Sequence, residues 1–226
     1  MEGTVTGMLI RLSRSIVVAC AVFALAFAAH ANPILIYNTG VDAAGLPVAN
    51  GTIGDLHYVL TSVPGGTSEL IAITSVGGFP IPPWVGDDSI STWIRPNNSL
   101  VTDPEGMYDF RTTFNMTGLD LASAVLLGRW ATDNPGIDIL INGVSTGIGN
   151  PGEFVAWSNT FTIGGGFVAG VNTLDFIVQN GSGSVGNPTG LRVEISGSAN
   201  AIPEPVSFVL LGAGLGALGM LRRRKA

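Results

Sequence analysis

The sequence predicts an all-β fold, a β-sandwich, for the middle of the chain, residues 32–200. Apolar and polar residues alternate with a period of two in several windows, as they do in half-buried strands. Glycine, proline and asparagine separate these windows at short intervals, which is typical of strands joined by tight turns. Helical periodicity is confined to the two ends of the chain, which therefore have a different role from the middle.

The clearest alternation predicts strands in four windows, in which large apolar residues share one face and polar residues the other. Asp175 and Arg192 are examples of the polar positions. Asn142-Gly143 predicts a two-residue type I′ hairpin turn into Val144. The four windows are 108–114, 137–141, 174–179 and 191–195, and further strands are expected at 56–62, 69–75, 124–132 and 154–163.

Charge is distributed unevenly along the chain. Residues 32–200 contain four arginines, no lysine and fourteen acidic residues, which gives this part a net charge of about −10. Nucleic acids and anionic membranes bind to clustered lysine and arginine, so neither is an expected partner. A soluble acidic surface explains the charge, and affinity for Ca²⁺ or for a neutral glycan are the alternatives.

Residues 1–31 have the pattern of a signal peptide. Arg11 and Arg14 precede an apolar run, and Ala29-His30-Ala31 is a small-x-small pattern that places cleavage by signal peptidase before Asn32. Cys20 could alternatively become a lipidated N-terminus, but the apolar run continues well past it. Export is the expectation, and the protein that remains after cleavage has no cysteine and hence no disulfide.

The segment 201–226 combines a rigid motif, an apolar helix and a basic tail. Pro203-Glu204-Pro205 holds the backbone extended, residues 206–221 form a predicted transmembrane helix, and Arg222, Arg223 and Arg224 begin the basic end. As a helix, 206–221 spans roughly 24 Å against about 30 Å of hydrocarbon, which makes a weak permanent anchor. An ordinary tail anchor is the alternative to a processing signal.

This arrangement resembles the PEP-CTERM sorting signal of Gram-negative bacteria, which a membrane enzyme called an exosortase recognises. The resemblance covers residues 202–226 and implies export, an inner-membrane intermediate, and cleavage near Pro203, Glu204 and Pro205. It also implies a final place at the cell surface or in an exopolysaccharide-rich matrix. Exosortase, signal peptidase and exopolysaccharide are thus the expected partners.

The middle of the chain resembles the galactose-binding-like jelly roll over about residues 90–197. The likeness rests on the order of three segments: 110–114 reads FRTTF, 128–134 ends in an Asp-bearing loop, and 138–143 ends in an Asn-Gly hairpin. The closing strands are similar at 176–180 and 190–195. The resemblance implies a jelly-roll β-sandwich of the carbohydrate-binding kind, without transferring a binding site.

Residues for chemistry are few. His57 is the sole histidine after residue 31, so a Ser-His-Asp triad would have to use it. The sequence has no nucleophile-elbow motif for such a triad, and His57 is expected at a strand edge instead. A pair of acids for glycoside hydrolysis could come from Asp87 with Asp88, from Asp103 with Glu105, or from Asp133 with Asp138. Calcium is a second possibility, because Asn97, Asp103 and Glu105 are hard oxygen ligands in one short segment. No other cofactor is expected.

Tryptophans are the candidates for stacking on a sugar ring, with core packing as the alternative for each. Trp84, which follows a proline-rich segment, is the best exposed candidate, and Trp93 and Trp130 are the next, with Trp157 a fourth. The sequence therefore predicts a non-enzymatic, exported surface or matrix protein that binds exopolysaccharide or mediates adhesion. A purely structural matrix component and a glycoside hydrolase are the alternatives.

Overall fold

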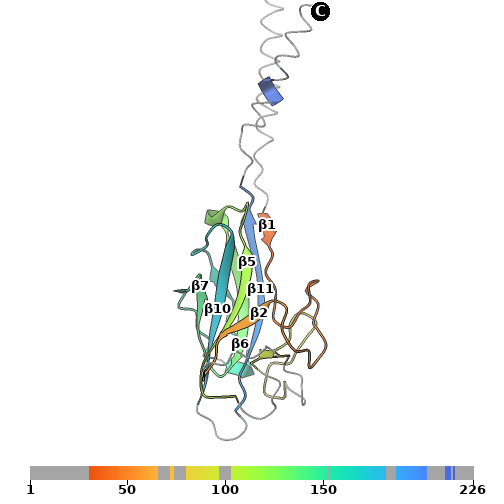
Figure 1. Ribbon diagram of the computed structural model, residues 1–226, viewed down its shortest axis with the longest axis vertical. Helices are drawn as coiled ribbons and strands as arrows, with labels where there is room; N and C mark the ends of the chain where they lie inside the picture. Colours follow the sequence, from red (N-terminus) through yellow and green to blue (C-terminus); the bar gives the residue numbers. More distant parts are fainter. Residues whose placement is uncertain are drawn as a thin grey trace, which may run out of the picture. The chain divides into compact units, whose positions relative to one another are not determined.

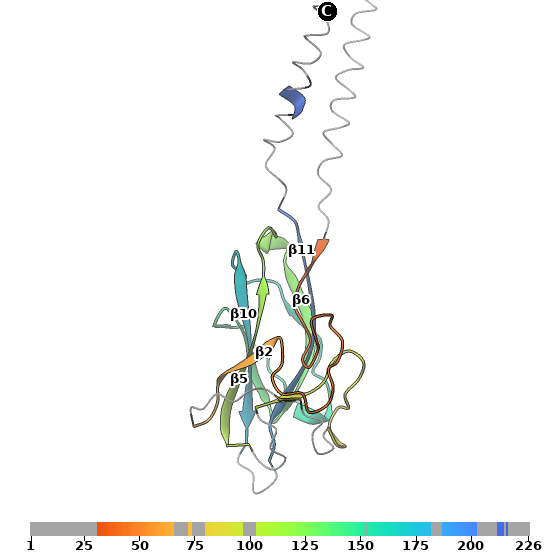
Figure 2. The same cartoon turned by 45° about the vertical axis from the view of Figure 1, so that its right-hand side comes forward.

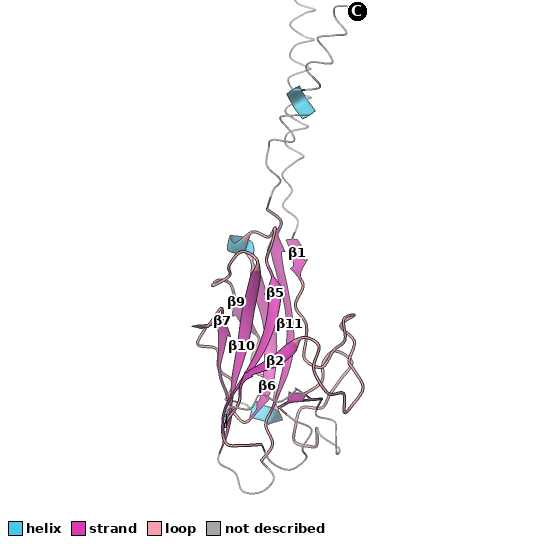
Figure 3. Ribbon diagram, in the orientation of Figure 1, coloured by secondary structure: helices cyan, strands magenta, loops and turns pink. Residues whose placement is uncertain are grey.

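The computed structural model describes residues 31–65, 72–73, 80–96, 103–151, 153–181, 187–202, 212–214 and 216. The chain divides into two units, of which Ala31–Asn200 contains the strands. Figure 3 shows that this unit is built almost wholly from strands and loops. The predicted all-β fold is confirmed for this part of the chain, whose described helices are two single 3-10 turns, η3 (Leu121–Ser123) and η4 (Glu153–Val155).

Two antiparallel sheets face one another. The β5–β10 sheet has the strand order β2-β5-β10-β7-β8, and the β6–β11 sheet has the order β3-β4-β11-β6-β9, with β1 also pairing with β11. Figures 1 and 2 show β10 and β5 in one layer and β11 and β6 in the other. The strands are β1 (Ala31–Ile34), β2 (Tyr58–Ser62), β3 (Ala72–Ile73), β4 (Ile94–Arg95), β5 (Gly106–Asn115), β6 (Val125–Asp133), β7 (Gly136–Ile141), β8 (Val144–Ser145), β9 (Phe161–Ile163), β10 (Val171–Asn180) and β11 (Gly190–Asn200).

The core lies between the two sheets and consists of the apolar residues that alternation placed on one face. Tyr108, Phe110 and Phe114 of β5 are buried there, as are Phe176 of β10 and Val193 of β11. Trp130 and Phe176 come from opposite sheets, and their ring centroids lie 5.6 Å apart. Burial of such large side chains from both layers is the main stabilising term for this unit.

The Asn142-Gly143 hairpin is confirmed. Asn142 has φ 51° and Gly143 has φ 77°, so both central residues are left-handed, as a type I′ turn requires. Ile141 pairs with Val144 across the turn and so joins β7 to β8.

Two local predictions need correction. Ile137 shares a predicted face with Ile139 and Ile141 but is 44% exposed. The register explains this, because Ile177 pairs with Asp138 and Val178 with Gly136, which leaves Ile137 in a bulge. The sequence predicts a single strand at 154–163, but the structure has the short helix η4 there, followed by a loop and the three residues of β9. Here the apolar residues serve loop packing, which period-two counting cannot distinguish from a strand.

The side of β11 away from β6 is covered in three ways. Ala31–Ile34 pairs with its C-terminal end and Ile94 of β4 with its N-terminal end. Between them, residues 38 and 39 take the place of a strand. Asn38 Oδ1 accepts from the backbone N–H of Ile195 at 2.8 Å, and Thr39 Oγ1 accepts from that of Val193 at 3.0 Å. The backbone N–H of Thr39 in turn donates to the backbone oxygen of Val193 at 3.1 Å. The middle of β11 is thereby held in place where its polar face carries charge.

Candidate functional site

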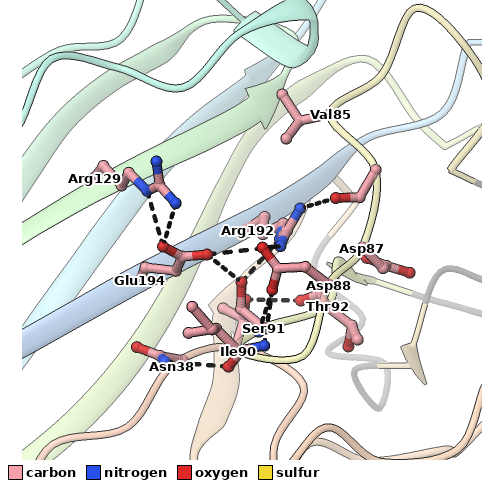
Figure 4. Close-up of polar contacts among 12 residues, drawn as sticks. Asn38, Val85, Asp87, Asp88, Ile90, Ser91, Thr92, Arg129, Arg192 and Glu194 are labelled. Atoms are coloured by element: carbon pink, nitrogen blue, oxygen red, sulfur yellow. Dashed lines mark hydrogen bonds and ion pairs between the residues drawn. The ribbon is translucent and has the colours of Figure 1, made fainter.

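A cluster of charged side chains lies on the outer face of the β6–β11 sheet (Figure 4). Glu194 of β11 pairs in register with Arg129 of β6, and Arg192 follows on the same face of β11. The loop 81–92 crosses this face and brings Asp88 and Ser91 to it. These five residues, Asp88, Ser91, Arg129, Arg192 and Glu194, are called the outer-face cluster.

Arg192 is the centre of the cluster and is completely buried beneath the loop. Its Nε donates to Ser91 Oγ at 2.9 Å, and one terminal nitrogen donates to the backbone oxygen of Gly86. The other terminal nitrogen lies 2.9 Å from Asp88 Oδ2 and 3.6 Å from Glu194 Oε1. A buried guanidinium needs this many partners to offset the loss of water. Arg192 therefore fixes the loop onto the sheet.

Asp88 stabilises a turn of the loop 81–92 and also pairs with Arg192. Its Oδ1 accepts from the backbone N–H of Ile90 at 2.8 Å and of Ser91 at 3.1 Å. Partial desolvation of the carboxylate acts in the opposite direction, but these two N–H groups and Arg192 together hold the pKa of Asp88 below its ordinary value. The carboxylate is thus ionised at neutral pH and serves to orient the loop.

Arg129 is the solvent-facing cation of the cluster, with 41% of its side chain exposed. Its Nε and Nη2 both contact Glu194 Oε2, at 2.8 and 2.7 Å, and Ser91 Oγ donates to the other oxygen, Oε1, at 3.1 Å. The guanidinium also lies over the ring of Trp157, with Cζ 4.4 Å from the ring centroid, and Cζ of Arg192 lies 4.7 Å from it. Two cations against one indole hold the tryptophan in a fixed orientation.

Two open grooves adjoin beside Arg129 and Trp157, and both have the size of small-molecule sites. The Trp157 groove has a volume of about 460 Å³, and the Arg129 groove one of about 340 Å³. Thr160 lines both. The Trp157 groove is lined by Ile148, Gly149, Asn150, Pro151, Trp157, Ser158, Asn159, Thr160 and Phe161. The Arg129 groove is lined by Asn38, Ile90, Leu127, Gly128, Arg129, Thr160, Glu194, Ile195 and Ser196.

The three tryptophans ranked first as glycan contacts, Trp84, Trp93 and Trp130, line neither of the two grooves. Trp93 and Trp130 are completely buried, so neither offers a ring face to a ligand, which corrects the expectation for these two. Trp84 is partly buried, and its ring packs against Trp93 at 4.6 Å and against Phe154 at 5.7 Å between centroids. Trp157, the fourth candidate, lines the Trp157 groove.

Asp103, one of the predicted calcium ligands, has a different set of partners. Its Oδ2 lies 2.9 Å from Arg95 Nη2 and accepts from the backbone N–H of Thr189 at 2.9 Å. Both side chains of this ion pair are almost fully buried. Glu105 is exposed, and Asn97 lies outside the described residues. Where residues are described, no three His, Cys, Asp or Glu side chains gather as a metal site, and calcium stays a prediction.

Asp87 and Asp138, two further candidate acids, and His57 contact nearby backbone. Asp87 Oδ1 accepts from the N–H of Trp93 at 2.9 Å, and Asp138 Oδ1 accepts from that of Gly147 at 3.0 Å. His57 directly precedes β2, where its Nε2 lies 3.0 Å from the backbone oxygen of Asp42. These contacts hold turns and loops in place.

A second charged group lies on the outer face of the β5–β10 sheet. Arg111 of β5 pairs in register with Asp175 of β10, and their side chains form an ion pair. Asp109 is two residues away on the same strand face. Desolvation by partial burial raises the pKa of Asp109 above its ordinary value; a hydrogen bond from Thr61 opposes this effect, and the nearby charge of Asp175 adds to it.

Replacing Asp109 by asparagine is therefore expected to stabilise the protein at neutral pH. The folded state binds the Asp109 proton more tightly than the unfolded state, so the stability this proton contributes is present at acid pH and lost as pH rises through the folded pKa. The gain from Asp109→Asn should thus be largest at pH 7 and shrink toward acid pH. Urea unfolding of both proteins across this pH range measures it, and a gain that grew on acidification would contradict the assignment.

The residues of the two predicted targeting signals are mostly outside the described part of the chain. This applies to Ala29, Pro203, Glu204, Pro205 and the arginines at 222–224. Ala31 and Asn32, which flank the predicted cleavage point, are exposed residues at the start of β1. Of the predicted membrane helix, residues 212–214 and 216 are helical. Across the described residues, no helix has both the length and the apolar character needed to cross a bilayer.

The sequence signal for the outer-face cluster was present but weak. Arg129 and Arg192 are two of only four arginines between residues 32 and 200, and Arg192 and Glu194 alternate with the core residues of β11. Nothing local in the sequence indicates that residues 88 and 91 cover them.

The chain matches no protein-family model and no curated protein.

Proposed function

We propose that this protein is exported and binds a glycan, an exopolysaccharide of the cell surface or matrix, in the grooves beside the outer-face cluster. The observation that carries the proposal is Trp157: an indole held by two guanidinium groups at the wall of an open groove. An aromatic ring is the platform on which the C–H face of a sugar packs, and a fixed ring loses little entropy on binding. Polar side chains around it supply partners for hydroxyl groups.

A galactose-binding-like jelly roll is the finer fold that we propose for Ala31–Asn200. In support, the chain alternates between the two sheets in the order β5, β6, β7, then β9, β10, β11, as expected of a jelly roll. The residues in the cluster favour a binding protein over a glycoside hydrolase. Asp88 and Glu194 both form ion pairs with arginine side chains, whereas a hydrolase needs a carboxyl group that is placed to protonate the leaving group.

Replacing Trp157 by alanine in the full-length protein is expected to weaken binding to exopolysaccharide by about 30-fold or more, the effect of losing a hot-spot aromatic residue. Affinity gel electrophoresis against purified exopolysaccharide measures this. Trp84→Ala is the matched control, because Trp84 lines neither groove, and it should bind normally. Equal binding by wild type and Trp157→Ala would contradict the proposal, and no binding by either would favour a purely structural matrix component.

Sorting by an exosortase through the C-terminal signal is part of the same proposal. Glu204 stands between two prolines that fix its backbone, which lowers the entropy cost of docking in a protease site. Glu204→Ala should therefore block cleavage and leave a full-length, membrane-bound form in a host that carries an exosortase. Cell fractionation measures the two forms. Equal retention of residues 206–226 in wild type and variant would indicate an ordinary tail anchor.

A further inference from the structure

We propose that the two adjoining grooves bind an internal segment of a neutral polysaccharide, with successive sugar residues in the Trp157 groove and the Arg129 groove. This inference rests on the proposed glycan-binding function and adds the charge class of the sugar and the part of the chain that is recognised.

The charge of the site favours a neutral sugar. The residues that line the Trp157 groove carry no charge, and the Arg129 groove contains one arginine and one glutamate that are paired with each other. Arg192 is enclosed between Asp88 and Glu194, so it offers no free positive charge either. Residues 32–200 carry a net charge of about −10, which repels a polyanion such as a uronic acid polymer.

The lining matches the two faces of a pyranose ring. In the Trp157 groove, Trp157, Pro151 and Ile148 are apolar surfaces for C–H groups, whereas Asn159 and Thr160 can exchange hydrogen bonds with hydroxyls. In the Arg129 groove, Leu127 and Ile90 are 46% and 48% exposed and form the apolar wall. Glu194 accepts and Arg129 donates on the polar side. Each groove thus combines apolar surface with a few fixed polar groups.

The position of the grooves favours internal recognition. Both are open and lie on or beside the outer face of the sheet, and they meet at Thr160, where Arg129 and Trp157 are in contact. An extended polymer can pass from one groove to the other without its ends being enclosed. A second sugar residue therefore adds a second set of contacts, and binding becomes tighter with chain length.

The test uses the full-length protein in detergent and calorimetric titration with neutral gluco-, galacto- and manno-oligosaccharides of increasing length. Oligomers whose reducing ends are blocked as methyl glycosides form a parallel set, and oligouronates of matched length form a third. We expect at least one neutral series to bind about tenfold more tightly on going from one residue to two, with no effect of end-blocking. The dissociation constant of the neutral oligosaccharides should change less than about twofold between low and high salt.

The variants separate this inference from the proposed function. Trp157→Phe should retain most of the affinity and Trp157→Ala little of it, while Val171→Ala, an exposed change on β10 in the other sheet, should have no effect. Tighter binding of oligouronates, lost at high salt, would overturn the neutral class and leave glycan binding intact. A monosaccharide that binds as tightly as the oligomers would overturn internal recognition. Absence of binding in all three series, or binding indifferent to Trp157→Ala, would refute the proposed function itself.

Discussion

Replacing Arg95 by methionine is expected to lower the free energy of unfolding by about 3–5 kcal/mol, the cost of leaving a buried charge without its partner. The side chains of Arg95 and Asp103 are 2% and 0% exposed, so water cannot take over the role of the guanidinium. The Thr189 N–H remains as a partner of Asp103, but a neutral hydrogen bond does not offset the lost ion pair. Urea unfolding followed by tryptophan fluorescence measures the change.

The double variant Arg95→Met, Asp103→Leu is the control for this pair. With both charges removed, the desolvation cost disappears, and most of the lost stability should return. A loss below about 1 kcal/mol in Arg95→Met, or full recovery of its stability on adding Ca²⁺, would contradict the structural role of the pair. The second result would instead favour Asp103 as a calcium ligand.

Replacing Trp130 by alanine is expected to lower the free energy of unfolding by about 3–5 kcal/mol through the cavity it leaves. Trp130 is completely buried, and the ring of Phe176 from the opposite sheet packs against it. The indole also packs closely against Gly136, because a Cβ atom on this residue would lie 2.4 Å from the ring. The ring therefore fills the space that the glycine leaves. Thermal and urea unfolding measure the effect.

Trp157→Ala is the matched comparison, because this ring is partly exposed and belongs to the groove. It is expected to cost only about 1 kcal/mol, the order of the lost cation–π contacts. Trp130→Ala should leave glycan affinity unchanged in the protein that remains folded. The reverse pattern, a stable Trp130→Ala protein that fails to bind glycan, would instead favour Trp130 as a glycan contact.

Local patterns were sufficient for much of the fold. Alternation in β5 and β10 placed Phe110 and Phe176 in the core, where they pair in register, and Asn142-Gly143 specified its own turn through two left-handed residues. Period-two counting failed where the backbone departs from a regular strand. The bulge at Ile137 is set by pairing with β10, and the loop before β9 is set by contacts with β6, such as that of Ser158 with Trp130.

The proposed binding site could not be predicted because the outer-face cluster depends on contacts between distant segments. Arg192 and Glu194 alternate with the core residues of β11, a pattern typical of residues on a solvated strand face. Their burial comes from a loop about a hundred residues earlier, which Ser91 joins to both of them. For the same reason the sequence favoured Trp84, which follows a proline-rich segment, over Trp157, whose orientation depends on Arg129 of a separate strand.

The most direct test of the account is an NMR titration of the isotope-labelled full-length protein with the neutral oligosaccharide that binds best. Indole N–H signals report each of the four tryptophans separately, once assigned by single tryptophan-to-phenylalanine variants. We predict that the indole signal of Trp157 and the Nε–H signal of Arg129 shift together with saturable dependence on sugar, while that of buried Trp130 stays in place. Shifts confined to Trp84, or no shift at Trp157 under conditions where the sugar binds, would contradict the assignment of the glycan site to these grooves.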